Sequence, residues 1–160
     1  MPRGEFSAQE VLTIAKEMEE EGLAFYKAVA GHVTDPDAKA LFLKLASDEV
    51  RHVRDIERLG GWAEAYFPSE HDSLVAQYVQ GAVDTKVFPP LSKVPEIAAS
   101  ARGVAKAIDF GIGSEKRAMD FYARAKSESR SAEAGEMFGR LYAEEEEHLR
   151  LLTALRRNYD

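Results

Sequence analysis

The sequence predicts an all-α protein, a four-helix bundle built from two helical hairpins with a long crossover between the second and third helices. Apolar residues recur at steps of three and four along four long segments of the chain. Short connections join the first segment to the second and the third to the fourth. The stretch between the two pairs, about residues 61–102, contains Pro68, Pro89, Pro90 and Pro95 and breaks the helical pattern.

The first hairpin is predicted from Ser7 to Leu59. Its first helix runs from Ser7 to about Gly31, with Ser7 and Glu10 as a capping box and Gly31 as the C-cap. Its second helix begins at Pro36 and stops before Gly60 and Gly61. The inward faces of the two helices comprise Leu12, Ala15, Glu19, Gly22, Leu23 and Tyr26, and Leu41, Phe42, Leu45, Glu49, His52, Ile56 and Leu59.

The second hairpin is predicted from helices over Arg102–Lys126 and Ser131–Arg156. Their inward faces comprise Ile108, Ile112 or Gly111, Glu115, Ala118, Met119 and Tyr122, and Phe138, Leu141, Glu145, His148, Leu151 and Leu155. In the crossover, a short helix is expected near Asp72–Gln80 and another from Pro95. We expect residues 1–160 to form one domain, because the crossover is too short and too rich in proline for a second one.

The two hairpins repeat one pattern at an offset of 96 residues, with halves of about 7–60 and 103–156. The identical pairs are Glu19/Glu115, Phe25/Phe121, Tyr26/Tyr122, Ala38/Ala134, Phe42/Phe138, Leu45/Leu141, Glu49/Glu145, His52/His148, Arg54/Arg150 and Leu59/Leu155. Roughly three identities are expected by chance over this length from ordinary residue frequencies. Because most of the identities lie on the inward faces, the repeat indicates a shared buried site.

Six of the repeated residues, four glutamates and two histidines, are candidate metal ligands. Glu19 and Glu115 occupy positions where the helical pattern calls for an apolar side chain. An ionised carboxylate costs several kcal/mol in a core unless it is paired or bound to metal. The spacing Glu-x-x-His places both side chains of each motif, Glu49 with His52 and Glu145 with His148, on one helical face. Two divalent cations would balance four carboxylates, with the histidines as neutral ligands.

Other polar residues have simpler interpretations. A single Glu-x-x-His is weak evidence for metal binding, because most such pairs are solvated or pair with Lys and Arg. The neighbours of Glu145, namely Glu144, Glu146 and Glu147, are expected on an exposed acidic face, and His32 and His71 at the surface or in loops. Tyr26 and Tyr122 are either plain core residues with a hydrogen-bonded hydroxyl or donors to a ligating carboxylate across the bundle. The repeated Arg54 and Arg150 are expected in surface salt bridges.

These motifs resemble the rubrerythrin branch of the ferritin-like superfamily. Glu-x-x-Gly-x-x-Phe-Tyr at 19–26, Glu-x-x-Ala-x-x-Phe-Tyr at 115–122 and Glu-x-x-His at 49–52 and 145–148 match that family's paired half-motifs. The resemblance implies a ferritin-like bundle with a non-heme di-iron centre. It also implies that Glu49 and Glu145 bridge the two ions, and that the protein reduces peroxide or oxidises Fe(II) with dioxygen or peroxide.

The sequence departs from the family at two places. Full-length rubrerythrins carry a second iron site held by four cysteines, whereas this sequence has none, so we expect an external electron-donor protein or other reductant. Rubrerythrins also carry an extra glutamate three residues after the third-helix ligand, where this chain has Ala118, mirroring Gly22. Its absence predicts a more symmetric site and weakens a peroxidase assignment.

The composition of the chain argues against two classes of protein, those that bind nucleic acid non-specifically and those that span a membrane. A net charge of −7 argues against non-specific nucleic-acid binding. No apolar run is long enough to span a membrane, and no signal-peptide core follows Met1, so a cytoplasmic location is expected.

Three functions remain open. The first is a di-iron oxidoreductase that scavenges peroxide or has ferroxidase activity in oxidative stress. The second is ferritin-like iron storage or transport without turnover. The third is a partner-binding bundle whose site is vestigial. Two iron ions are the expected cofactor, although manganese or a mixed pair suits the same ligands. A homodimer is expected by analogy with the family.

Overall fold

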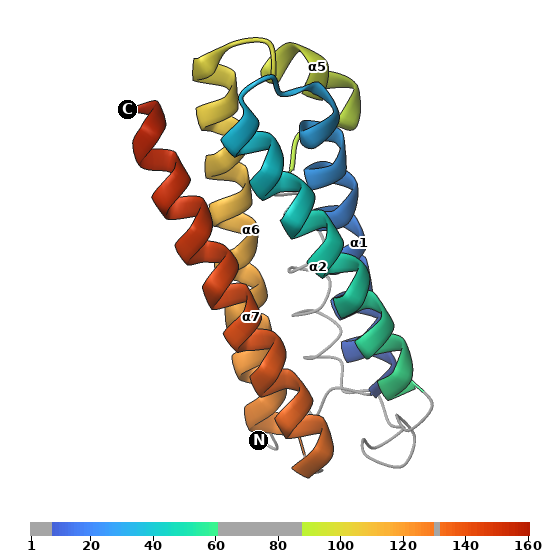
Figure 1. The fold of residues 1–160 in the computed structure, drawn as a ribbon. Helices are drawn as coiled ribbons and strands as arrows, with labels where there is room; N and C mark the ends of the chain where they lie inside the picture. Colours follow the sequence, from blue (N-terminus) through green and yellow to red (C-terminus); the bar gives the residue numbers. More distant parts are fainter. Residues whose placement is uncertain (1–7, 61–87, 130–131) are drawn as a thin grey trace, which may run out of the picture.

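The computed structural model describes residues 8–60, 88–129 and 132–160, and throughout this part the regular structure is helical. Four long helices form the bundle: α1 (Ala8–His32), α2 (Pro36–Gly60), α6 (Ala101–Glu128) and α7 (Ala132–Arg156) (Figure 1). The predicted all-α helical bundle is therefore confirmed, with helix ends within about two residues of those expected from the sequence.

Three short helices complete the described structure. They are the 3-10 helix η1 (Leu91–Lys93), the single-turn helix α5 (Val94–Ile97) and the 3-10 helix η2 (Arg157–Tyr159) that ends the chain. The helix expected from Pro95 is α5. The helix expected near Asp72–Gln80 and the surface position expected for His71 fall outside the described residues. None of the described helices combines the length and apolar character needed to cross a membrane.

The direction of the helices explains the long crossover. In Figure 1, α1 and α2 run antiparallel, as do α6 and α7, whereas α2 and α6 run the same way. Because α2 ends at the opposite end of the bundle from the start of α6, the chain must return along the whole bundle between them. The predicted connectivity, two hairpins joined by a crossover, follows from this arrangement.

The first hairpin turns at Asp35, which caps α2. Its carboxylate accepts a hydrogen bond from Ala38 N at 3.4 Å, and Pro36 occupies the first helical position, where its missing N–H costs nothing. The expected C-cap at Gly31 is wrong: α1 continues to His32, and no described glycine has a positive φ. Pro36 disfavours helical dihedrals at Asp35, the residue before it, so α1 and α2 cannot join into one continuous helix.

Two apolar clusters fill the bundle, one on each side of a polar layer. The first contains Leu12, Ile14, Ala15, Ile56, Leu59, Ala118, Phe121, Tyr122, Ala125, Ala134, Phe138 and Leu141. The second contains Phe25, Tyr26, Val29, Ala30, Val33, Ala38, Phe42, Leu45, Ala46, Val94, Val104, Ala107, Ile108, Leu152 and Leu155. Buried glutamates and histidines from the middle of each helix separate the two clusters. The polar layer is therefore held between apolar cores that exclude bulk water.

The start of α6 depends on a close backbone approach. Ser100 caps the helix by accepting a hydrogen bond from Gly103 N at 3.0 Å. A Cβ atom on Gly103 would lie 1.7 Å from the carbonyl oxygen of Ile97 in α5. Glycine is therefore required where α5 packs against the first turn of α6.

We expect Gly103→Ala to destabilise the protein by about 2 kcal/mol or more, because the backbone of α5 or α6 must move. Gly31→Ala is the matched control: a Cβ there meets nothing within 4 Å, and alanine favours a helix over glycine by about 1 kcal/mol. Urea denaturation of both variants measures the difference. Equal stability of Gly103→Ala and the wild type would contradict this account of the junction.

Candidate metal centre

The six residues singled out by the repeat converge in the polar layer. Each long helix contributes at least one of them, and the exposed fraction of each is at most 3%. They are Glu19 from α1, Glu49 and His52 from α2, Glu115 from α6, and Glu145 and His148 from α7. The structure therefore brings together side chains that lie as much as 129 positions apart in the sequence, from residue 19 to residue 148.

The six side chains form two overlapping groups with the spacing of metal ligands. In one group, Glu19, Glu49, His52 and Glu145 place one ligand atom each within 4.8 Å of one another. In the other, Glu115 and His148 take the places of Glu19 and His52. Glu49 and Glu145 belong to both groups, so the arrangement has room for two cations that share these carboxylates.

The orientation of Glu145 supports a cation at this position. Its two carboxylate oxygens are buried without a hydrogen bond, as is Nδ1 of His148. The carboxylate lies only 3.1 Å from His52 Nδ1 and 3.0 Å from His148 Nδ1, but the angles do not suit hydrogen bonding. These atoms are close because they face a common point rather than one another. The donor set therefore fits a bound divalent cation.

Protons occupy the cluster when it holds no metal. Burial, together with the charges of Glu19 and Glu145, raises the pKa of Glu49 well above its ordinary value, and burial with the charges of Glu19 and Glu115 does the same for Glu145. Burial disfavours protonation of His148, but the carboxylates of Glu115 and Glu145, 3.5 Å and 3.0 Å from Nδ1, favour the protonated ring, outweigh burial and raise its pKa to about 10. Protonation of these groups is therefore favoured in the metal-free site, and a cation that binds there must displace the protons.

Glu19 and His52 complete the charge pattern. Burial favours the neutral form of Glu19, but hydrogen bonds with Glu49 and His52 outweigh burial and lower its pKa to about 2. For His52, burial is outweighed by the nearby carboxylates of Glu145, Glu19 and Glu49, which favour the protonated ring, and its pKa is raised. An anionic Glu19 beside a cationic His52 is the pairing expected of a buried site that lacks a metal ion.

Each hairpin supplies a tyrosine to the glutamate of the other. Tyr26 of α1 donates a hydrogen bond to Glu115 of α6 at 2.5 Å, and Tyr122 of α6 donates to Glu19 of α1. Both phenols are fully buried, and their pKa values are raised by burial and by the charges of these carboxylates, so both remain donors at neutral pH. The two hydroxyls fix the orientation of the carboxylates of Glu115 and Glu19.

A small residue lets Tyr26 reach its partner. A Cβ on Gly111 would lie 3.2 Å from Cε1 of Tyr26 and 3.1 Å from Cδ1 of Leu152. The ring therefore packs directly against the backbone of α6, one helical turn before Glu115. Of the two inward-facing residues considered from the sequence, Gly111 is buried and Ile112 is only half-buried.

Two carboxylates missed by the sequence reasoning hold the outer nitrogens of the histidines. Nε2 of His52 lies 2.5 Å from Glu144, and Nε2 of His148 lies 3.1 Å from Asp48. Burial opposes ionisation of both acids, but hydrogen bonds with neighbouring cations and imidazoles lower their pKa values. As ionised carboxylates they accept from Nε2–H, which leaves Nδ1 free to coordinate a cation.

The expected exposure of Glu144 is therefore wrong. Its side chain is 28% exposed and contacts both His52 and Arg51, whereas Glu146 and Glu147 are exposed as predicted. The missed signal was the repeat itself, because adding 96 to Asp48 gives Glu144. The two residues conserve charge but not identity, so a comparison of identities overlooked them.

Ion pairs close the side of the site between α2 and α7. Arg51 contacts Glu144 at 3.0 Å and Asp48 at 3.5 Å, and Lys44 contacts Asp48 at 2.5 Å. The imidazoles of His52 and His148 stack just inside, with ring centroids 5.5 Å apart. Of the repeated arginines, Arg150 forms the predicted surface salt bridge, with Glu147, and Arg54 is exposed; His32 is also exposed, as expected.

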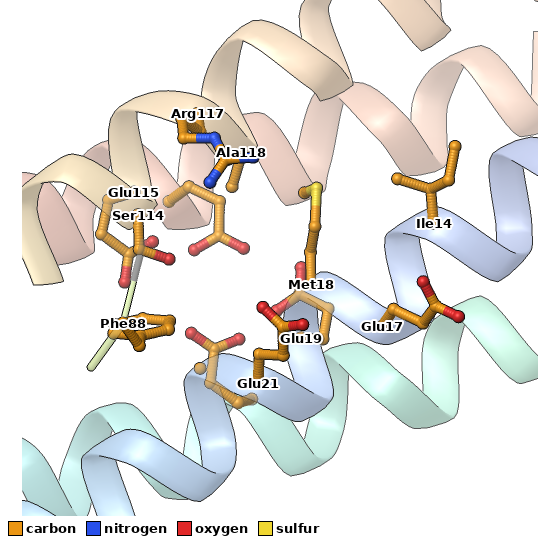
Figure 2. A pocket seen from close by; sticks show the side chains of 13 residues that line it. Ile14, Glu17, Met18, Glu19, Glu21, Phe88, Ser114, Glu115, Arg117 and Ala118 are labelled. Carbon is orange, nitrogen blue, oxygen red and sulfur yellow. The ribbon is translucent and has the colours of Figure 1, made fainter. Parts of the chain in front are cut away.

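The opposite side, between α1 and α6, is hollowed. Here a cavity of about 40 Å³ reaches the carboxylates of Glu19, Glu49, Glu115 and Glu145. Figure 2 shows Met18 extending from α1 toward α6 across this cavity, with Phe88 at its edge. Its walls include the small residues Gly22 and Ala118. A volume of this size holds roughly three water-sized molecules, enough for a small oxidant beside the carboxylates.

Fold and site together define a class, a helical bundle with a buried carboxylate–histidine centre that fits a di-iron protein. Within that class, the chain matches the Rubrerythrin family over residues 10–156 and belongs to it. The resemblance noted from the sequence is thus confirmed. No curated protein and no solved structure matches the chain.

Metal binding is expected to release protons and to strengthen as pH rises. The raised pKa values of His148, Glu49 and Glu145 favour protons that the cation displaces, so apparent affinity should fall about tenfold for each unit that the pH is lowered, per proton released. Titration of the metal-free protein with Co(II) in weak buffer, with a pH indicator, counts these protons. Binding without proton release would show that the metal-free carboxylates are already ionised.

We expect Asp48→Ala to weaken the binding of one of the two cations about tenfold or more, because Nε2 of His148 loses its acceptor. Glu146→Ala is the control, since it removes an exposed carboxylate from the same layer of the bundle. Co(II) binding isotherms of the two variants give the comparison. An unchanged second affinity in Asp48→Ala would mean that Asp48 does not orient the imidazole.

Proposed function

We propose that the protein is a non-heme di-iron oxidoreductase that reacts with hydrogen peroxide or dioxygen. Glu19 and His52 would hold one ion, Glu115 and His148 the other, and Glu49 and Glu145 would bridge them. The observation that carries the proposal is the unpartnered carboxylate of Glu145, buried between the two ligand groups and lining the cavity between α1 and α6. Iron suits this set of oxygen and nitrogen donors, and a manganese or mixed pair is the alternative.

The cavity supports a reaction with a small oxidant. Its walls at Gly22 and Ala118 carry little side-chain volume, and a Cβ on Gly22 would lie 3.6 Å from Oε1 of Glu49. The space beside the shared carboxylates therefore admits molecules of two heavy atoms, such as peroxide or dioxygen. Larger organic substrates would not reach the carboxylates through it.

The chemistry of peroxide reduction fits two one-electron donors. Hydrogen peroxide with two electrons and two protons gives two molecules of water, and a pair of ferrous ions supplies one electron each when bound. The protein holds the ligands in place through Tyr26, Tyr122, Asp48 and Glu144. It has no cysteine to relay electrons, so an external protein or small reductant would restore the ferrous state.

Anaerobic Fe(II) titration of the metal-free protein, followed by peroxide or dioxygen in separate samples, tests the proposal. We expect saturation at two ions per chain and faster growth of ferric absorbance with peroxide. Equal or faster reaction with dioxygen would favour ferroxidase activity, a reading that Ala118 supports because the extra carboxylate of rubrerythrins is absent there. Failure to bind two ions would refute the di-iron assignment.

Glu49→Ala is expected to abolish stoichiometric binding of both ions, since this carboxylate belongs to both ligand groups. Glu57→Ala on the exposed side of α2, where the glutamate contacts Lys16 at 3.3 Å, is the matched control. The metal-free Glu49→Ala variant should stay folded, because it loses a buried acid. Circular dichroism checks folding, and retention of two ions would remove Glu49 from the site.

The oligomeric state distinguishes an enzyme from an iron-storage protein. We expect a homodimer by analogy with the family, and size-exclusion chromatography with light scattering measures it. A large multisubunit particle would instead favour iron storage.

A further inference from the structure

The side of the metal centre between α2 and α7 and the side between α1 and α6 differ in charge. Between α2 and α7, the cations Lys44 and Arg51 and their ion pairs with Asp48 and Glu144 cover the histidines. Two cations there balance two carboxylates, so a divalent cation approaching that side meets a closed network of ion pairs without net charge. Between α1 and α6, the carboxylates are reached through the cavity.

The rim of that cavity is acidic on the α1 side. Glu17 and Glu21 are exposed, lie one helical turn apart and both border the cavity (Figure 2). Arg117 borders it from α6 and is the one basic side chain among the described residues that line it. Two negative charges and one positive charge leave the rim with a net negative charge, and the four buried glutamates behind it add to the potential.

A second feature points to a cation, independently of the acidic rim. Glu145, fully buried, lines the same cavity, and both of its carboxylate oxygens lack a hydrogen-bond partner. Met18 lines the cavity and extends from α1 toward α6. It is an unbranched side chain that changes rotamer easily, so it can move aside for a passing ion.

We infer that the cavity between α1 and α6 is the route by which divalent cations reach the centre, with Glu17 and Glu21 as a transient cation-binding site at its rim. The inference rests on the proposed two-metal function and adds the path and the residues that serve it. These glutamates set the rate of loading, whereas the six inner residues set its extent. A change at the rim therefore alters kinetics and leaves stoichiometry unchanged.

Stopped-flow mixing of metal-free protein with Co(II) under anaerobic conditions tests the route, because Co(II) absorbance reports coordination without oxidation. In the double variant Glu17→Gln/Glu21→Gln, we expect loading about five- to tenfold slower at low ionic strength. Arg117→Gln, which removes a cation from the rim, should load faster than the wild type. Both effects should shrink as salt screens the rim charges.

The matched control is Glu136→Gln/Glu146→Gln, which removes the same charge from exposed positions on α7. If it slows loading as much as the rim variant, net charge and not the route sets the rate, and the inference is overturned. An unchanged rate in the rim variant also overturns it.

A steric variant tests the same path without changing charge. Ser114→Phe places a large side chain at the α6 wall of the cavity, and slower loading with two ions at saturation is expected. An unchanged loading rate in Ser114→Phe overturns the route. Wild-type protein that never reaches two ions refutes the proposed function instead, so the two failures are distinguishable.

Discussion

The burial of four carboxylates at the centre of an apolar bundle is the constraint on which this structure depends. Isolated in a core, such charges cost several kcal/mol each. The protein offsets this cost with protons when no metal is present, as the raised pKa values of Glu49, Glu145 and His148 indicate. Two divalent cations replace those protons in the proposed holoprotein. The apolar clusters shield the two ends of the polar layer from bulk water, which strengthens the interactions of the carboxylates with one another and with what they bind.

Reciprocal contacts between the hairpins turn two copies of one pattern into a single centre. Tyr26 reaches from the first hairpin to Glu115, and Tyr122 reaches back to Glu19. The same exchange joins α2 and α7, where Asp48 holds His148 and Glu144 holds His52. Neither hairpin can therefore build an ordered ligand set alone, since each depends on the other for the hydrogen bonds that orient its carboxylates and imidazoles.

Symmetry ends at the outer surface, and the proposed function follows from that difference. On one side, Lys44 and Arg51 bind the carboxylates that support the histidines, which closes the centre and fixes its imidazoles. On the other side, Gly22 and Ala118 leave a cavity in contact with the carboxylates. A site that is closed and oriented on one side and accessible on the other suits the binding of an ion and the admission of a small oxidant.

The helices, the two hairpins and the six central residues could all be predicted from local pattern. Helical periodicity sets which side chains share a face, and the 96-residue repeat picks out those that recur on it. It misjudged features that local pattern does not control. Gly31 was expected to be a C-cap but lies inside α1, which continues to His32; the turn between the helices ends at Asp35, which caps α2. Glu144 resembles an exposed acid but binds His52.

The distribution of the outer contacts depends on how the four helices pack against one another. Asp48 and Glu144 each contact a histidine of the opposing helix, and this contact depends on the distance between α2 and α7. That Gly111 must be small depends on the ring of Tyr26 from another hairpin. The cavity between α1 and α6 likewise exists only once the helices are packed. Periodicity fixes the direction of a side chain about its own helix axis, whereas contacts between helices depend on their spacing and rotation, which no single segment encodes.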